Sequence, residues 1–323
     1  MPLPLEPSID QVDLPVIDIS EFLEDLDGED LSQLRDHPLL AKLRKACKEW
    51  GLFYLVNHGI PVEILDKSQK ASRDLLSMPI EVKDRVTTSK PIDSYYRSPN
   101  FETFGFPDTT KSDSIAQTCL KIWPEGNANF SETTEKYAVC VSKLSEKVTK
   151  MILLSLGLDA KAFYHSHFEK CTAKLHINGY SSEKKLIGEE TLPSHADSAC
   201  LTVLYQDDVG GLQIRSQEGE WFNVKPLSHS FVVNLGDSFK AWTNGGYRSA
   251  VHRVVCKGWI NRMSIAFITT FPMEMEIWAP AELVDDNNPR RYKPFQYSLL
   301  KHEVQTNKEI KDRTTFLELF AGI

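Results

Sequence analysis

The sequence predicts an α+β fold whose core is a jelly roll of two packed sheets, preceded by a helix-rich domain and followed by a helical tail. Two observations carry this prediction. Apolar residues recur at helical spacing in the first half of the chain, and from residue 172 onward they alternate with period two. In the second half, turn sequences such as Gly236-Asp237 and Asn244-Gly-Gly246 separate short apolar runs. Short strands at this spacing are typical of a β-sandwich or barrel.

The first 130 residues read as an N-terminal domain with two strands and two helices. Leu39, Leu40, Leu43 and Cys47 recur at helical spacing, and Met78-Pro79 ends a second helical pattern. Residues 21–36 are acidic and polar and suit a solvent-facing loop or a poor helix. The predicted strands cover residues 14–19 and 51–56, and the predicted helices cover residues 38–49 and 61–77.

An irregular, aromatic-rich segment follows between residues 90 and 128. Tyr95, Tyr96, Phe101 and Phe104 lie there among Pro, Ser, Asp and Asn residues. Aromatic side chains in such a loop line an apolar ligand pocket or anchor the loop onto the core, and the sequence leaves both readings open.

A connecting segment, residues 131–170, leads to the β core. Tyr137, Val141, Leu144, Val148 and Ile152 predict one long helix over residues 131–157. The core is assigned to residues 171–275 and the helical tail to residues 276–323, with helices over 293–301 and 314–320. The predicted core strands cover residues 173–178, 199–206, 211–215, 220–224, 230–235, 248–256 and 262–270.

Composition excludes several classes of protein. The net charge of −8, with no cluster of Lys and Arg, argues against binding to nucleic acid. No signal peptide and no apolar run of membrane-spanning length is found. The six cysteines are scattered without a Cys-x-x-Cys pair, so free thiols are expected. We expect a cytoplasmic protein that binds neither membrane nor nucleic acid, with a monomer as the default state.

Two histidines and a carboxylate form the strongest chemical signal. Leu192-Pro-Ser-His195-Ala-Asp197 reads as a turn feeding a strand, and residues two apart in a strand share a face. His252 is the best third ligand, because four candidate strands between it and Asp197 bring an antiparallel chain back beside His195. Two imidazoles and one carboxylate leave the opposite side of a metal open, as in non-haem Fe(II) oxygenases.

The histidines also have less specific readings. A His-x-Asp pair alone is a weak signal for a metal site, since His195 could equally be a surface or capping residue near the start of a strand. His58, in a turn, and the pair His165 and His167 are better explained as structural residues. A structural zinc site fits poorly, because such sites favour four closed ligands, often cysteines.

A second cluster suits an anionic ligand. Arg262 and Ser264 are two apart on a β run, so they share a face, and a guanidinium beside a hydroxyl suits a carboxylate. An Arg directed into an apolar barrel needs an anionic partner, because an unpaired buried charge is costly. Asn178 and Tyr180, at the end of the strand that opens the core, supply an amide and a phenol that can meet the same ligand.

The whole pattern resembles the plant-type Fe(II)- and 2-oxoglutarate-dependent dioxygenases. The resemblance rests on His-x-Asp, a distant His and Arg-x-Ser, and it extends over almost the whole chain. Gly51-Leu-Phe-Tyr-Leu-Val-Asn-His-Gly-Ile-Pro61 resembles the N-terminal domain of that family, and Phe231-Val-Val-Asn-Leu-Gly-Asp237 resembles its core. The tail, including the ending Phe320-Ala-Gly-Ile323, is similar to gibberellin 20-oxidase-like proteins.

The resemblance implies a double-stranded β-helix core that holds Fe(II) through His195, Asp197 and His252. It also implies that 2-oxoglutarate is bound by Arg262, Ser264, Tyr180 and Asn178, that O2 is consumed with release of succinate and CO2, and that ascorbate supports activity. The expected substrate is a small hydrophobic plant metabolite that is hydroxylated, desaturated or demethylated. Its expected contacts are Tyr95, Tyr96, Phe101, Phe104 and Phe271.

The sequence departs from the family pattern at three places, and one of them bears on the identity of the substrate. Ala196 stands where Thr is commoner, and Ser181-Ser182 replaces the usual Pro-Pro. The Leu-Pro-Trp-Lys-Glu-Thr motif of true gibberellin 20-oxidases is absent, which argues against gibberellin. Two alternatives stay open at this point: a same-fold oxidase that does not use 2-oxoglutarate, and a non-catalytic relative that only binds a small ligand.

Overall fold

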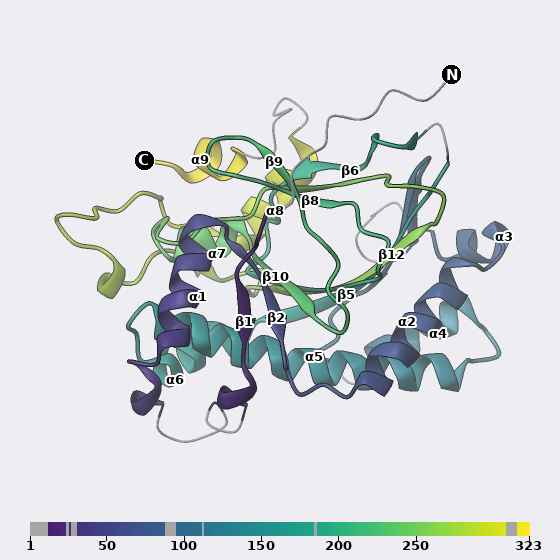
Figure 1. Ribbon diagram of the computed structural model, residues 1–323, viewed down its shortest axis with the longest axis horizontal. Helices are drawn as coiled ribbons and strands as arrows, with labels where there is room; N and C mark the ends of the chain where they lie inside the picture. The colour runs from purple at the N-terminus through teal and green to yellow at the C-terminus, as the bar shows by residue number, and fades with distance from the viewer. Residues whose placement is uncertain are drawn as a thin grey trace.

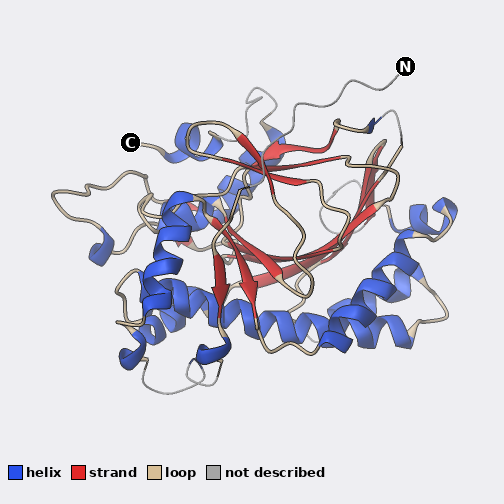
Figure 2. Ribbon diagram, viewed as in Figure 1, coloured by secondary structure: helices blue, strands red, loops and turns tan. Residues whose placement is uncertain are grey.

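Two β-sheets face each other, with helices packed on the outer side of the larger one (Figures 1 and 2). The computed structural model describes residues 12–23, 26, 31–87, 95–111, 113–183, 186–307 and 315–323. In spatial order, the large sheet contains β1(Val16–Asp18), β2(Leu52–Val56), β10(Phe231–Leu235), β7(Leu201–Gln206), β12(Arg262–Thr270), β5(Thr172–Tyr180), β4(Phe101–Phe106) and β3(Tyr95–Ser98). The small sheet contains β6(Glu190–His195), β11(His252–Val255), β8(Leu212–Arg215) and β9(Trp221–Asn223). This architecture confirms the predicted α+β jelly roll.

The large sheet is buried on both faces because its strands alternate between two apolar environments. Residues such as Leu175, Ile177 and Ile265 belong to the larger core, which is packed against the helices. Their neighbours on the other face, such as Tyr54 and Val232, belong to a second core shared with Leu212, Ile214 and Val254 of the small sheet. Four of the functional side chains discussed below, on β12 and β5, lie on this inward face, whereas the two histidines belong to the small sheet.

Helices cover the outer face of the large sheet (Figure 2). The long helix α5 crosses beneath the sheet and packs against α1, α2 and α4, as well as against β12 and β7. Valine, leucine and isoleucine at helical spacing on α5 are buried. These helices are α1(Pro38–Glu49), α2(Val62–Leu76), α4(Ser114–Ile122) and α5(Ala128–Ser155).

Smaller elements complete the chain. The tail contains the two helices that the sequence predicts. The first of them begins at Tyr297, several residues after its predicted start at residue 293. The segment with His165 and His167 forms a π-helical turn, η5(Tyr164–Phe168), in the connection from α6 to β5. The smaller elements are η1(Ser20–Phe22), η3(Ser32–Leu34), α3(Ile80–Lys83), η4(Asp84–Val86), α6(Ala160–Phe163), α7(Asp237–Trp242), β13(Glu276–Ile277), η7(Ala281–Leu283), β14(Phe295–Gln296), α8(Tyr297–Thr306) and α9(Phe316–Ala321).

The expectation of an irregular segment over residues 90–128 is wrong where the structure describes it. Residues 95–106 form the β3–β4 hairpin, which turns at Pro99-Asn100, and α4 follows. Residues 90–94 and 112 lie outside the described residues. Tyr95 pairs with Phe104 across the hairpin, so the aromatic residues have strand periodicity rather than loop character.

Helix α5 and strand β6 also differ from the prediction. Helix α5 begins three residues before the predicted start, because the Asn127 side chain accepts a hydrogen bond from the Phe130 N–H at 3.1 Å and caps the helix there. Strand β6 is absent from the predicted strands. Its sequence, Glu-Thr-Leu-Pro-Ser-His, contains a proline that disfavours strand.

Candidate active site

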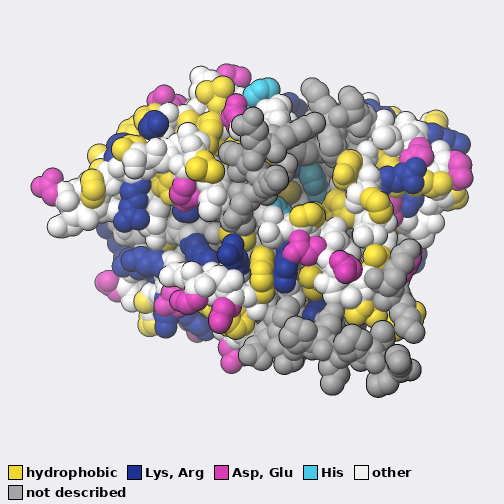
Figure 3. Space-filling model, turned by 90° about the horizontal axis from the view of Figure 1, so that it is seen from above, with side chains coloured by type: hydrophobic (Ala, Val, Ile, Leu, Met, Phe, Trp, Pro, Cys, Tyr) yellow, Lys and Arg dark blue, Asp and Glu magenta, His cyan; other side chains and the backbone are white. Residues whose placement is uncertain are grey.

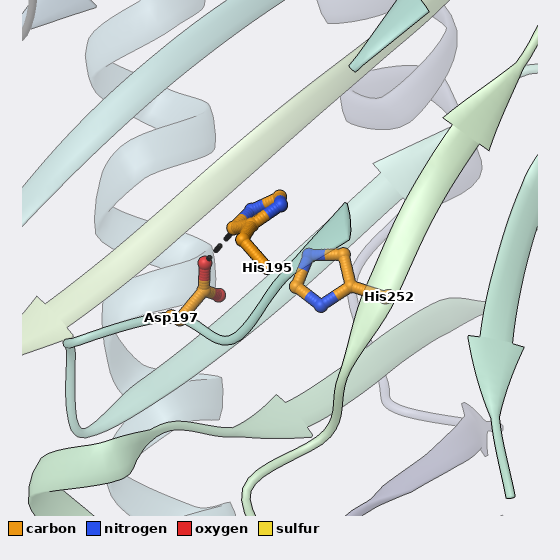
Figure 4. Close-up of side chains that lie close together, drawn as sticks. All are labelled: His195, Asp197 and His252. Atoms are coloured by element: carbon orange, nitrogen blue, oxygen red, sulfur yellow. Dashed lines mark ion pairs between the residues drawn. The ribbon is translucent and has the colours of Figure 1, made fainter. Parts of the chain in front are cut away.

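Three side chains converge at one point (Figure 4): two from neighbouring strands of the small sheet, β6 and β11, and one from the turn that follows β6. His252, the first residue of β11, is paired in register with His195, the last residue of β6. Asp197 lies just beyond the end of β6. One ligand atom from each residue lies within 4.8 Å of the other two, a spacing suited to a metal ion.

The structure brings together the three residues that the sequence predicted, but one reason for predicting them was wrong. His195 and Asp197 were expected to share a face of one strand, but the strand ends at His195 and the turn that follows carries Asp197. A tight backbone contact holds this turn, since the Asp237 N–H donates to the Asp197 carbonyl at 2.7 Å.

Both imidazoles are oriented by their own strands. Nδ1 of His195 lies 2.8 Å from the Pro193 carbonyl oxygen, and Nδ1 of His252 lies 2.9 Å from the Ala250 carbonyl oxygen. A carbonyl only accepts, so Nδ1 carries the proton on each ring and Nε2 keeps its lone pair. This outer-sphere arrangement prepares a histidine to bind a metal through Nε2.

Asp197 is held through one of its two carboxylate oxygens. Oδ2 accepts hydrogen bonds from the Thr202 hydroxyl at 2.7 Å and from the Asn234 amide at 2.9 Å. Oδ1 faces Nε2 of His195 at 3.6 Å. Thr202 and Asn234 were not predicted from the sequence, although strand alternation in residues 199–206 and 230–235 puts both on the inward face.

The surroundings of the site favour a negatively charged Asp197 and a neutral His252. Burial alone would raise the pKa of Asp197, but the neighbouring His195 and His252 and the Thr202 hydrogen bond hold this pKa well below its usual range. Burial, with the nearby His195, lowers the pKa of His252 and favours its neutral form. These are the protonation states that a divalent cation requires of its ligands.

A row of polar side chains crosses the inward face of the large sheet. Gln206, Ser264, Asn178 and Thr103 occupy directly opposed positions on β7, β12, β5 and β4. Residues directly opposite one another in an antiparallel pair project to the same face. The four side chains therefore line the barrel interior on neighbouring strands.

Arg262 is a buried cation without an ion pair among the residues that the structure describes. Its guanidinium lies over the Tyr180 ring at 4.5 Å and is 4% exposed. Nη1 lies 3.5 Å from the Ser264 hydroxyl, which also lies 3.4 Å from the Asn178 amide and 3.3 Å from the Tyr180 hydroxyl. The four residues proposed from the sequence thus form one cluster, and that cluster lacks an anion.

The structure divides the five aromatic residues expected to contact a substrate. Tyr95, Phe104 and Phe271 are fully buried in the helix-facing core, where Phe271 packs against Phe168. They do not meet the triad. Phe101 lies on the inward face, with its ring 5.2 Å from that of Tyr180, and Tyr96 occupies the position opposite Thr103.

The triad remains accessible. The side chain of His195 is 25% exposed and that of Asp197 is 18% exposed. A cavity of about 150 Å³ adjoins them, and Val304 of α8 and Phe316 of α9 form part of its wall. Histidine side chains are visible inside a hollow of the molecule in Figure 3.

Comparisons with known proteins agree with this geometry. Residues 168–270 match the 2OG-Fe(II) oxygenase superfamily, and residues 14–126 match the N-terminal family described as non-haem dioxygenase in morphine synthesis. A gibberellin 20-oxidase-like protein of Arabidopsis thaliana is 34% identical over 294 residues, which cover 84% of this chain and 85% of the relative.

Solved structures show the same similarity. The dioxygenase for auxin oxidation from rice has a TM-score of 0.81 and 30% identity, and the match covers 96% of this chain and 100% of that one. JOX2 in complex with 2-oxoglutarate, iron and JA has a TM-score of 0.82 and 25% identity, and the match covers 97% of this chain and 90% of that one.

A jelly roll with two histidines and a carboxylate at an accessible site, and a buried cation nearby, defines the class of non-haem iron oxygenases. The chain belongs to the 2OG-Fe(II) oxygenase superfamily. It is an oxidoreductase, a dioxygenase with Fe(II) and 2-oxoglutarate as cofactors. The resemblance predicted from the sequence is confirmed. None of the described helices is long and apolar enough to span a membrane.

Proposed function

We propose that the chain oxidises a C–H bond of a small, largely apolar metabolite at an iron held by His195, Asp197 and His252. The observation that carries this proposal is the pairing of an open three-ligand cluster with a buried Arg262 that has no ion pair among the described residues. When bound, Fe(II) and 2-oxoglutarate supply the activation of O2, with succinate and CO2 as by-products.

The protein residues divide this work. Arg262, Ser264 and Tyr180 bind the far carboxylate of 2-oxoglutarate, because they are the buried donors that lack an anionic partner. Asn178, next to Ser264, binds toward the near carboxylate. The apolar interior, which includes Leu212 of the small sheet, keeps water from the cosubstrate.

The metabolite is proposed to be a small carboxylic acid with an apolar body. One solved relative is named for auxin oxidation and another was crystallised with JA. In this chain, Lys174 and His176 share the inward face of β5 with Asn178 and Tyr180, so the strand carries basic side chains beyond those proposed to bind 2-oxoglutarate. Phe101 and Tyr96 are the proposed apolar contacts. Hydroxylation, desaturation and demethylation all begin at such a C–H bond.

Anaerobic titration tests the cofactor assignments. Addition of Fe(II) and 2-oxoglutarate to the purified protein should produce a visible charge-transfer band. Arg262→Ala should weaken 2-oxoglutarate binding, and His252→Ala should abolish the band. Arg253→Ala is the matched control, because Arg253 also lies over an aromatic ring, Trp221 at 4.1 Å, but in the small sheet. Iron binding without a band in the wild type would contradict the assignment.

Turnover tests the reaction class. Matched pairs of an aromatic or alicyclic acid and its methyl ester should be screened for succinate formation and O2 uptake. One succinate per oxidised substrate is expected, with the acid preferred over its ester. A consistent preference for the esters would contradict the proposal of an acidic substrate.

The six cysteines, which are all free, fit a reducing compartment such as the cytoplasm. A monomer is proposed as the working state, since all the proposed ligands come from one chain.

A further inference from the structure

Gln206 is hydrogen-bonded to Arg262, the buried cation of the cluster proposed to bind 2-oxoglutarate. It is the last residue of β7 and lies directly opposite Ser264 of β12. Its amide oxygen accepts a hydrogen bond from Nη2 of Arg262 at 2.9 Å. The guanidinium is therefore held between the Tyr180 ring, the Ser264 hydroxyl and the Gln206 amide.

Two donors in this cluster have no acceptor among the described residues. They are Nε of Arg262 and the amide nitrogen of Gln206, and both atoms are buried. Buried donors in proteins are nearly always paired. Two orphaned donors beside one hydroxyl indicate that an acceptor belongs between them.

The charge of the partner matters as much as its position. An amide oxygen orients Arg262 without neutralising it, whereas a carboxylate at the same place would form an internal ion pair. Asp207, which follows Gln206 in the sequence, feels the charge of Arg262 but forms no ion pair with it among the described residues. Its carboxylate accepts from the Met263 N–H at 2.7 Å and pairs with Arg73 at 3.1 Å. The positive charge of Arg262 thus remains available to a ligand.

We propose that Gln206 is a positioning residue for the far carboxylate of 2-oxoglutarate. Its oxygen fixes the guanidinium of Arg262, and its amide N–H donates to the same carboxylate. This inference rests on the proposed role of Arg262. It adds to that role a requirement that the side chain at position 206 be neutral.

The test is anaerobic titration of the iron-loaded protein, with the charge-transfer band as the readout. Two ligands are compared: 2-oxoglutarate, and 2-oxopentanoate, which has the same chelating end and a methyl group in place of the far carboxylate. Gln206→Glu should lower the affinity for 2-oxoglutarate at least about tenfold, because the new carboxylate and that of the ligand then compete for the one guanidinium of Arg262. Binding of 2-oxopentanoate should be unchanged or stronger.

Two further variants guard against a folding artefact. Gln206→Leu removes the hydrogen bonds without adding charge and should weaken 2-oxoglutarate by roughly two- to tenfold. Gln213→Glu is the matched control, because Gln213 accepts from Nε of Arg253 at 2.8 Å in the small sheet. It should leave the affinity for both ligands unchanged.

The outcomes separate this inference from the proposed function. A wild-type protein that binds iron but forms no band contradicts the proposed use of 2-oxoglutarate. A normal wild-type band with unchanged 2-oxoglutarate affinity in both Gln206 variants overturns the role of Gln206 alone. Equal losses for 2-oxoglutarate and 2-oxopentanoate also overturn it, because a purely structural defect would affect both ligands.

Discussion

At the scale of single residues, the carboxylate of Asp197 shows how neighbouring side chains orient a proposed metal ligand. Thr202 and Asn234 both donate to Oδ2, which leaves Oδ1 directed at the imidazole of His195. Partners of this kind typically change metal affinity by 10- to 100-fold when removed. The rigidity of the site therefore depends on two residues that need not touch the metal.

Thr202→Val should lower the affinity for Fe(II) by roughly 10- to 100-fold, because the isosteric side chain cannot donate to Asp197. Equilibrium binding of the metal measures this. Thr191→Val is the control, since the Thr191 hydroxyl donates to the Val254 carbonyl at 3.2 Å and not to a ligand. Equal affinities for Thr202→Val and the wild type would show that Asn234 alone orients the carboxylate.

His58 gives a pH-dependent contribution to stability. Burial lowers the pKa of His58, and the nearby His229 side chain lowers it further. The hydrogen bond to the His229 carbonyl oxygen acts in the opposite direction. The unfolded chain therefore binds a proton at a higher pH than the folded chain does. Stability is lost as the pH falls below about 6.5, by at most about 1.4 kcal/mol per pH unit.

His58→Gln should remove that part of the acid dependence, because glutamine does not titrate. Chemical denaturation measures the free energy of unfolding of both proteins at several pH values between about 7.5 and 5, a range that spans the ordinary histidine pKa of about 6.5. The slopes of this free energy against pH are then compared. His302→Gln, on the exposed side of α8, is the control. An unchanged slope in His58→Gln would mean that its protonation does not couple to unfolding.

The residues of the proposed metal and cosubstrate sites were predictable from the sequence, but their hydrogen-bond partners were not. Histidine, aspartate and arginine are rare enough in strands for their spacing to carry a signal. Thr202, Asn234 and Gln206 are common polar residues, and their role depends on which strands are neighbours. That pairing joins β7 to β10 and β12, which lie far apart in sequence.

At the scale of elements, the turn from β10 into α7 sets the position of the turn that carries Asp197. A Cβ atom on Gly236 would lie 2.2 Å from the Ala199 carbonyl oxygen and 2.7 Å from that of Asp197. Both atoms are backbone and cannot rotate away. Only glycine allows these two segments to pack this closely.

Gly236→Ala should displace the turn that carries Asp197. We expect a loss of about 1–3 kcal/mol in the free energy of unfolding, typical of overpacking. We also expect Fe(II) affinity to fall at least about tenfold, since a ligand is moved. Calorimetry and metal titration measure the two effects. Gly258→Ala is the control, because a Cβ atom on Gly258 would have no described neighbour within 4 Å. Lower stability with normal iron affinity would show that the turn relaxes without moving Asp197.

Elements with a single clear period were predicted well, as α1 illustrates over residues 38–49. The β3–β4 hairpin was missed because its aromatic residues alternate between a helix-facing core and the barrel interior. Each face carries aromatic residues beside polar ones such as Thr103, so apolar and polar residues do not alternate and the strand period is hidden. The turn at Pro99-Asn100 was the available signal.

At the scale of the whole molecule, the large sheet unites the N-terminal region with the core. Strands β1 and β2 form one edge of this sheet, and β3 and β4 form the other. The division of the sequence at residue 130 therefore runs through a continuous hydrogen-bonded sheet. Such long-range pairing has no local signature in the sequence.

A fragment of residues 131–323 should not fold by itself. It would expose the unpaired edges of β10 and β5, which are aggregation-prone, together with the face covered by α1 and α2. The intact chain should unfold in one transition, whereas the fragment should aggregate or lack cooperative unfolding. Circular dichroism and size-exclusion chromatography measure this, and a folded, monomeric fragment would contradict it.

The same sheet bears on how the protein is made. Leu55 of β2 pairs with Phe231 of β10, 176 positions later, and β12 pairs in turn with β7 and β5. A chain leaving the ribosome thus has its first strands ready long before their partner exists. The sheet closes only after β12 has emerged, so the proposed iron site forms only once the chain has been made as far as Thr270. Until then, the early strands need shielding, as slow-folding, non-local β pairing generally does.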